Sequence, residues 1–179
     1  MPDVPEELSR WLADGYAQAF RTACLILRNQ ALAEEAVQDA FLRAWRFRAQ
    51  IPEGEGVKPW LYRVLVNACY SKLRSENRHQ LRTAGPDALE TITASGPTPH
   101  QGAEGAEVSF VVGEALEALP EHLRVPVVLR YFTGLSEREI ASAIGRRPGT
   151  VKSRLHEARR RLALDSRLSA LASAEGGAE

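Results

Sequence analysis

The sequence predicts an all-α protein, built as two small helical domains joined by a flexible acidic linker. Apolar residues recur at spacings of three and four along both halves of the 179-residue chain, and no stretch alternates as a strand does. A segment rich in Gly, Pro, Ser and Thr separates the halves, which is typical of a linker. The C-terminal half also carries a helix-turn-helix pattern. We therefore expect a first domain at 1–82, a linker at 83–107, a helix-turn-helix domain at 108–168 and a tail at 169–179.

The first domain is expected to hold three or four helices. Helical spacing of apolar residues runs through 8–23 and again through 32–44, and Asn29 can cap or break the chain between these two helices. A loop punctuated by Pro and Gly follows at 50–57, and a third helix is expected over 58–75.

One side of the third expected helix mixes aromatic, cationic and amide side chains. At spacings of three and four, these residues are Trp60, Arg63, Asn67, Tyr70 and Arg74. Rings can stack on unpaired bases, cations can hold phosphates and an amide can read a base edge, so the pattern suits single-stranded nucleic acid. It equally fits an aromatic pair that covers a neighbouring helix while the arginines lie in water. The residues alone leave both interpretations open.

Charge is unevenly distributed although the formal net charge is zero. Residues 146–161 contain seven Lys or Arg and one acidic residue, whereas 83–107 contain four acidic residues and no Lys or Arg. Such asymmetry indicates one surface for nucleic acid and an acidic segment that stays away from it or imitates it.

The stretch 135–162 predicts two short helices joined by a tight turn. Ser136 and Glu139 have the spacing of a capping box that would start the first helix. Gly145 can take the left-handed conformation that ends a helix, and Pro148 suits the first turn of the next one. This is a helix-turn-helix, whose second helix lies in the DNA major groove. The alternative is a charged, solvated helix in an ordinary bundle.

The second of these helices has two distinct faces. Its apolar stripe consists of Val151, Leu155, Ala158 and Leu162. On the opposite side, Lys152, Ser153 and His156 can reach base edges, and Gly149 lets the backbone approach DNA closely. Phosphates position a protein without specifying a sequence, and they suit Arg146, Arg147, Arg159, Arg160 and Arg161.

No pattern in the chain indicates catalysis. Cys24 and Cys69 form no C-x-x-C pair and the four histidines are scattered, so we expect no metal and no cofactor. There is no phosphate-binding loop, nucleophile elbow or H-E-x-x-H, and we expect no catalytic residue and no enzyme activity. The N-terminus does not read as a signal peptide and no apolar run approaches the ~20 residues of a membrane helix, so we expect a cytoplasmic protein.

Three stretches resemble bacterial RNA polymerase sigma factors of the extracytoplasmic function (ECF) class, within the sigma-70 family. AEEAVQDAFLRAW at 33–45 resembles the helix with which that family binds core polymerase. KPWLYRVLVNACYSKLR at 58–74 resembles its promoter −10 segment, and 116–162, which contains GTVKSRLHEAR, resembles its −35-binding domain. The resemblance matches 1–82 to sigma region 2 and 108–168 to sigma region 4. It implies a subunit that gives core polymerase its promoter preference and helps to open the DNA.

The resemblance also implies roles for individual residues. Core polymerase would bind Glu35, Gln38, Asp39, Leu42, Arg43 and Arg46. The melted −10 strand would lie on Lys58, Trp60, Arg63, Asn67, Tyr70 and Arg74. Asn67 matches the position that receives a flipped-out base. The duplex −35 element would contact Arg147, Gly149, Thr150, Lys152, Ser153, Arg154, His156, Glu157, Arg159 and Arg160. The family further implies a linker that threads the RNA-exit path of polymerase and an anti-sigma protein that covers the polymerase-binding faces.

Two other functions fit parts of the sequence. A stand-alone helix-turn-helix regulator would bind duplex DNA as a dimer, but it leaves Trp60, Asn67 and the acidic linker without a role. A protein that merely sequesters a partner would keep its binding when Lys152 and Ser153 are replaced by alanine.

Overall fold

The computed structural model describes residues 11, 13, 15–52, 54–83, 103–166 and 168. Within these residues the chain is helical and contains no strand, which confirms the predicted all-α class. Residues 84–102 of the expected linker, and the expected tail at 169–179, lie outside the described residues. None of the described helices combines the length and apolarity needed to cross a lipid bilayer.

The N-terminal unit consists of α2 (Tyr16–Leu27), α3 (Gln30–Arg46) and α4 (Val57–Thr83), with 3-10 turns at Arg48–Gln50 and Gly54–Gly56 in the loop before α4. The expected cap between the first two helices is present, because the side chain of Asn29 accepts a hydrogen bond of 3.0 Å from the backbone N–H of Leu32. On its inner face α3 buries four alanines, whose small side chains let it pack closely against its neighbours: Ala33, Ala36, Ala40 and Ala44.

The C-terminal unit consists of α5 (Ala103–Ala118), α6 (Glu121–Tyr131), α7 (Glu137–Ile144) and α8 (Pro148–Ala163). Pro120 stands at the N-cap of α6 and separates it from α5, as its missing N–H favours. In this unit α7 and α8 form the helix-turn-helix, and α6 packs against both of them.

Three helix boundaries differ from the sequence-based expectation. The first helix is interrupted at Gly15, where an added Cβ would clash first with the backbone carbonyl oxygen of Trp11 and would lie 2.7 Å from Cδ1 of its ring, so this close approach requires glycine. The third helix continues beyond the expected end at residue 75 to Thr83, because no Gly or Pro stops it. Helix α5 begins at Ala103, inside the segment assigned to the linker.

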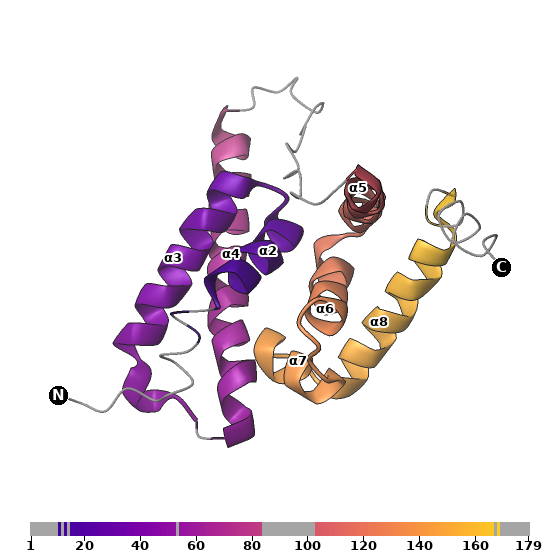
Figure 1. Cartoon of the computed structure of the whole chain (residues 1–179). Helices are drawn as coiled ribbons and strands as arrows, with labels where there is room; N and C mark the ends of the chain where they lie inside the picture. The colour runs from indigo at the N-terminus through magenta and orange to yellow at the C-terminus, as the bar shows by residue number, and fades with distance from the viewer. Residues whose placement is uncertain are drawn as a thin grey trace.

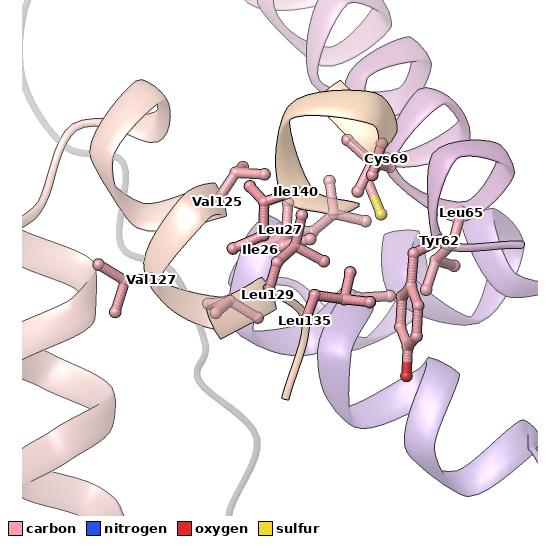
Figure 2. Close-up of a cluster of buried hydrophobic side chains, with 14 of the residues drawn as sticks. Ile26, Leu27, Tyr62, Leu65, Cys69, Val125, Val127, Leu129, Leu135 and Ile140 are labelled. Atoms are coloured by element: carbon pink, nitrogen blue, oxygen red, sulfur yellow. The ribbon is translucent and has the colours of Figure 1, made fainter. Parts of the chain in front are cut away.

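The two units pack against each other around one hydrophobic cluster. Figure 1 shows α3 and α8 on opposite outer sides of the molecule, with α2, α4, α6 and α7 between them. Helix α4 packs on α7, and α2 packs on α6. In Figure 2, Tyr62 and Cys69 of α4 and Ile26 of α2 converge on Leu135 and Ile140 of the C-terminal unit. The linker therefore joins two units whose cores are continuous in this structure.

Candidate nucleic-acid interface

The helix-turn-helix is built by the caps that the sequence indicates. The hydroxyl of Ser136 accepts from the backbone N–H of Glu139 at 3.3 Å, and the Glu139 carboxylate accepts from the N–H of Ser136 at 2.7 Å. These hydrogen bonds lower the pKa of Glu139. Gly145 ends α7 in the left-handed conformation with φ 63°, and the N–H of Arg146 reaches back to the Ala141 carbonyl at 2.9 Å. These local hydrogen bonds fix where α7 begins and how the chain turns from α7 into α8.

Helix α8 buries one face and presents the other. Val151, Leu155 and Ala158 are buried, and Leu162 packs at the edge of the core, as the spacing predicts. The candidate −35 residues with exposed side chains or an exposed backbone are Arg147, Gly149, Lys152, Ser153, His156, Arg159 and Arg160, whereas Thr150, Arg154 and Glu157 are half-buried. Donors that can reach a base edge therefore point away from the protein.

Glu157 is held by its own helix. Its carboxylate lies 2.9 Å from Nε of Arg161 and 3.2 Å from a terminal guanidinium nitrogen of Arg160. The Arg161 hydrogen bond lowers the pKa of Glu157. The Glu157 carboxylate is therefore already paired with two cations of its own helix.

The candidate −10 face of α4 has an exposed polar part and a half-buried aromatic part. Lys58, Arg63, Asn67 and Arg74 are exposed, whereas the rings of Trp60 and Tyr70 are half-buried. The Asn67 carbonyl accepts from the Ser71 hydroxyl at 2.9 Å, but within the described part of the chain no group bonds the Asn67 side-chain amide. That amide is available to a ligand. The rings of Trp60 and Tyr70 combine packing with partial access, which is compatible with both interpretations.

Four arginines from both units line one groove of about 670 Å³ between α4 and the helix-turn-helix. They are Arg63 of α4, Arg138 of α7, and Arg146 and Arg147 of the turn. Among the described residues no carboxylate pairs with these four guanidinium groups. The groove is therefore strongly positive, which suits an anion such as a nucleic-acid phosphate.

The candidate polymerase-binding residues lie on the outer face of α3. Glu35, Gln38, Leu42, Arg43 and Arg46 are exposed and Asp39 is half-buried. Two of them also contact α4, because Nζ of Lys72 lies 2.9 Å from the Glu35 carboxylate and 3.0 Å from that of Asp39. This bridge raises the pKa of Lys72.

Sequence reasoning missed two aromatic residues at the end of this face. Leu42 is 69% exposed, and beside it along the chain Trp45 is 47% and Phe47 44% exposed. The Arg48 guanidinium lies 4.9 Å from the centre of the Trp45 ring. The spacing of three between Leu42 and Trp45 was the available signal. An exposed apolar ridge of this kind suits contact with a protein partner.

The two cysteines are unsuited to surface chemistry. Cys24 and Cys69 are free and buried. Burial raises the pKa of Cys24 to about 11 and that of Cys69 to about 12. Among the described residues no group of His, Cys, Asp or Glu is arranged to hold a metal ion.

Comparison with known proteins gives a consistent result for both units. Residues 12–79 match the family described as Sigma-70 region 2, and residues 109–162 match Sigma-70, region 4. The chain is 36% identical over 149 residues to the ECF RNA polymerase sigma factor SigM of Mycobacterium tuberculosis, which covers 83% of this chain and 71% of SigM. It is 32% identical over 157 residues to the ECF RNA polymerase sigma factor SigE of Mycolicibacterium smegmatis, where the match covers 88% of this chain but 59% of SigE.

A solved structure supports the fold. The sigma factor RpoE, in its complex with the anti-sigma factor NepR from Bartonella quintana, aligns with a TM-score of 0.70 and 23% identity, over 89% of this chain and 99% of that one. Together, the matches to both sigma regions and to SigM show that the chain belongs to the ECF class of RNA polymerase sigma factors.

Proposed function

We propose that this protein is the promoter-specificity subunit of an RNA polymerase holoenzyme. It binds core polymerase through the outer face of α3, reads the duplex −35 element with α8 and holds the melted −10 strand on α4. It acts in the cytoplasm by binding alone and performs no chemistry of its own. The observation that carries the proposal is that α8 and α4 each present exposed polar side chains outward, among them Lys152, His156 and Asn67, whose side chains have no partner among the described residues.

The −35 element is the target of α8. Lys152, Ser153 and His156 project from the face opposite the buried stripe, which is the arrangement that places side chains against base edges in the major groove. Arg147, Arg159 and Arg160 flank them, and their charges suit the phosphates on either side.

The −10 element is the target of α4. Extruding a base from the stack costs a few kcal/mol, so a site prepared in advance must return that energy. The free amide of Asn67 offers hydrogen bonds to a base, and the half-exposed rings of Trp60 and Tyr70 offer stacking. Opening is thus favoured by binding the separated strand.

Core polymerase is the partner of α3. Leu42 and Trp45 expose apolar surface between charged residues, which is the composition of a protein interface with an apolar centre and a polar rim. We also propose an anti-sigma protein as a partner, because NepR is the anti-sigma factor of the structurally similar RpoE. It would cover the same α3 surface.

In vitro transcription tests the proposal. Purified core polymerase, with and without this protein, is given a library of promoters, and the start sites are sequenced. We expect defined start sites that appear only when the protein is present. Start sites that are the same without the protein would contradict the proposal.

Footprinting separates this function from that of a stand-alone regulator. A sigma factor should protect promoter DNA only together with core polymerase, whereas a regulator should protect it alone. Protection by the free protein at the same sites would favour the regulator.

A further inference from the structure

The groove between α4 and the helix-turn-helix gathers positive charge from both units of the chain. Its four arginines are Arg63, Arg138, Arg146 and Arg147, and we call it the arginine groove. All four side chains are exposed, and within the described part of the chain none of them takes part in a hydrogen bond or an ion pair. A groove that is lined by charges of one sign concentrates the opposite ions, so this groove attracts anions.

The arginine groove leaves room for a ligand. Small residues lie between the arginines of the C-terminal unit, namely Ala141 and Ser142 of α7 and Gly145 of the turn. The volume of about 670 Å³ falls within the ~300–1,000 Å³ typical of small-molecule sites. The groove is therefore large enough for an anion with more than one phosphoryl group.

The N-terminus of α8 adds to the positive potential of the same groove. Pro148 and Thr150 of its first turn line the groove, and no side chain caps this helix. The N–H groups of Thr150 and Val151 donate to the Arg147 carbonyl at 2.9 and 3.2 Å, whereas the N–H of Gly149 has no partner among the described residues. A free helix N-terminus favours an anion, and here it supplements the four guanidinium groups.

The acidic residues of the chain's own linker are too far away to fill the groove. Arg63 precedes the end of α4 at Thr83 by about 30 Å of helix. Figure 1 shows α7 beside the half of α4 that lies away from Thr83. Even a fully extended chain carries Asp87 and Glu90 no more than about 25 Å beyond Thr83. The other two acidic residues of 83–107 belong to α5, which Figure 1 places far from α7.

A single promoter element does not account for the groove either. Arg63 belongs to the proposed −10 face and Arg147 to the proposed −35 face, whereas Arg138 belongs to neither. Elements centred at −35 and −10 lie about 25 base pairs apart, or ~85 Å of duplex. One element therefore cannot contact Arg63 and Arg147 together where both line one groove. A compact anion can.

Linked phosphoryl groups are the chemistry that matches four guanidinium groups. Guanidinium binds phosphate oxygens through paired, charge-assisted hydrogen bonds. A terminal phosphoryl group carries a charge of about −1.5 to −2 near neutral pH, and each group joined to it adds further negative charge within a short length. No aromatic ring is among the described residues that line the groove, so nothing there selects a nucleobase.

We propose that the arginine groove binds a small anion with two or more linked phosphoryl groups, and that the bound anion competes with promoter DNA for Arg63 and Arg147. The competition rests on the proposed function, whereas the binding of the anion does not. The protein would thereby respond to a soluble polyphosphate through residues of its own DNA-binding surfaces.

Calorimetric titration of the full chain tests the binding. The probes are inorganic tripolyphosphate, adenosine triphosphate and sulfate, in buffer without Mg²⁺ and at equal ionic strength. We expect tripolyphosphate to bind at least about tenfold more tightly than sulfate. Adenosine triphosphate that binds as tightly as tripolyphosphate would identify the phosphate chain as the ligand, and tighter binding would identify a nucleotide. Binding of tripolyphosphate no tighter than that of sulfate would indicate an adventitious ion only and would overturn the proposal.

Substitutions locate the site after circular dichroism has shown equal helix content. Arg63→Gln and Arg138→Gln should each weaken tripolyphosphate binding about tenfold, and Arg138→Lys should lose less because it keeps the charge. Arg78→Gln is the matched control, because Arg78 is also an exposed cation of α4 but lies about 22 Å along the helix from Arg63. An equal loss in Arg78→Gln would show binding to general positive charge and would overturn the site.

Promoter binding tests the competition. Wild type or Arg138→Gln is incubated with or without tripolyphosphate, then core polymerase and promoter DNA are added at a fixed concentration of free Mg²⁺. We expect tripolyphosphate to reduce promoter binding by wild type at least about fivefold and by Arg138→Gln much less, with equal binding by the two proteins in its absence. Equal inhibition of both proteins would overturn the competition. If the calorimetry is as expected but no promoter is bound even without the anion, the proposed function is rejected and the anion site stands.

Discussion

Lys152 stands on the exposed face of α8, and its ammonium group has no hydrogen-bond or ion-pair partner among the described residues. Replacing it with alanine should therefore leave the fold within about 0.5 kcal/mol of wild type, as is usual for surface substitutions. If Lys152 contacts a base, the change should weaken −35 binding by about 1–3 kcal/mol, which is roughly 5- to 150-fold.

The assay is holoenzyme binding to promoter DNA with each −35 base pair changed in turn. The variant should lose discrimination at one or two positions and keep it at the others. Arg21→Ala is the matched control, because Arg21 is an exposed cation on α2, far from the helix-turn-helix in sequence, and it should bind every promoter as wild type does.

The salt dependence of promoter binding by the Lys152→Ala variant can refute a base contact. An equal loss on every promoter, together with a salt slope reduced by about one, would assign Lys152 to a phosphate. Unchanged binding on all promoters would remove it from the interface. Either outcome would refute the reasoning that an unpaired donor on this face reads a base.

Three further outcomes are expected. Asn67→Ala should slow promoter opening more than initial duplex binding, because the free amide meets a base only after melting; permanganate reactivity measures opening, and equal effects on both steps would contradict this role. Leu42→Ala should weaken holoenzyme formation by about 1–3 kcal/mol in a titration with core polymerase, whereas unchanged affinity would place the contact elsewhere. Ser136→Ala should destabilise the protein by about 1 kcal/mol in thermal unfolding at neutral pH. Since the Ser136 hydrogen bonds lower the pKa of Glu139 in the fold, their contribution is present above the ordinary glutamate pKa and is lost as the pH falls through the lowered one; a gap between wild type and Ser136→Ala that does not narrow on acidification would argue against it.

The structure shows ion pairs for three residues to which the sequence analysis had assigned only a role in binding a partner. Glu35 and Asp39 were expected to bind polymerase, and they also pair with Lys72, so their substitution removes an ion pair between α3 and α4 as well as any contact with a partner. Glu157 was grouped with the base-reading residues, and its carboxylate is occupied by Arg160 and Arg161. The spacing of residues in the sequence predicts which face of a helix they share, but it does not show which other side chains form ion pairs with them.

Local signals explain why much of the fold could be predicted. Caps, turns and apolar stripes depend on residues within about one or two helical turns, and the sequence displays them directly. The Ser136–Glu139 capping box, the left-handed Gly145 and the buried stripe of α8 were all confirmed. Helix ends were less certain: the first helix is interrupted at Gly15, beside Trp11, and α4 continues to Thr83, beyond its expected end at residue 75.

The sequence by itself therefore determined the helices, the helix-turn-helix and the family to which the chain belongs. Only the tertiary structure decided that the units close on each other. Arg28 and Glu117 meet across 89 residues of sequence, and Tyr62, Val66 and Cys69 form a second buried face of α4 beside the stripe that packs within its own unit. Periodicity reports that a face is apolar, whereas the choice of what covers it depends on long-range contacts that no local pattern encodes.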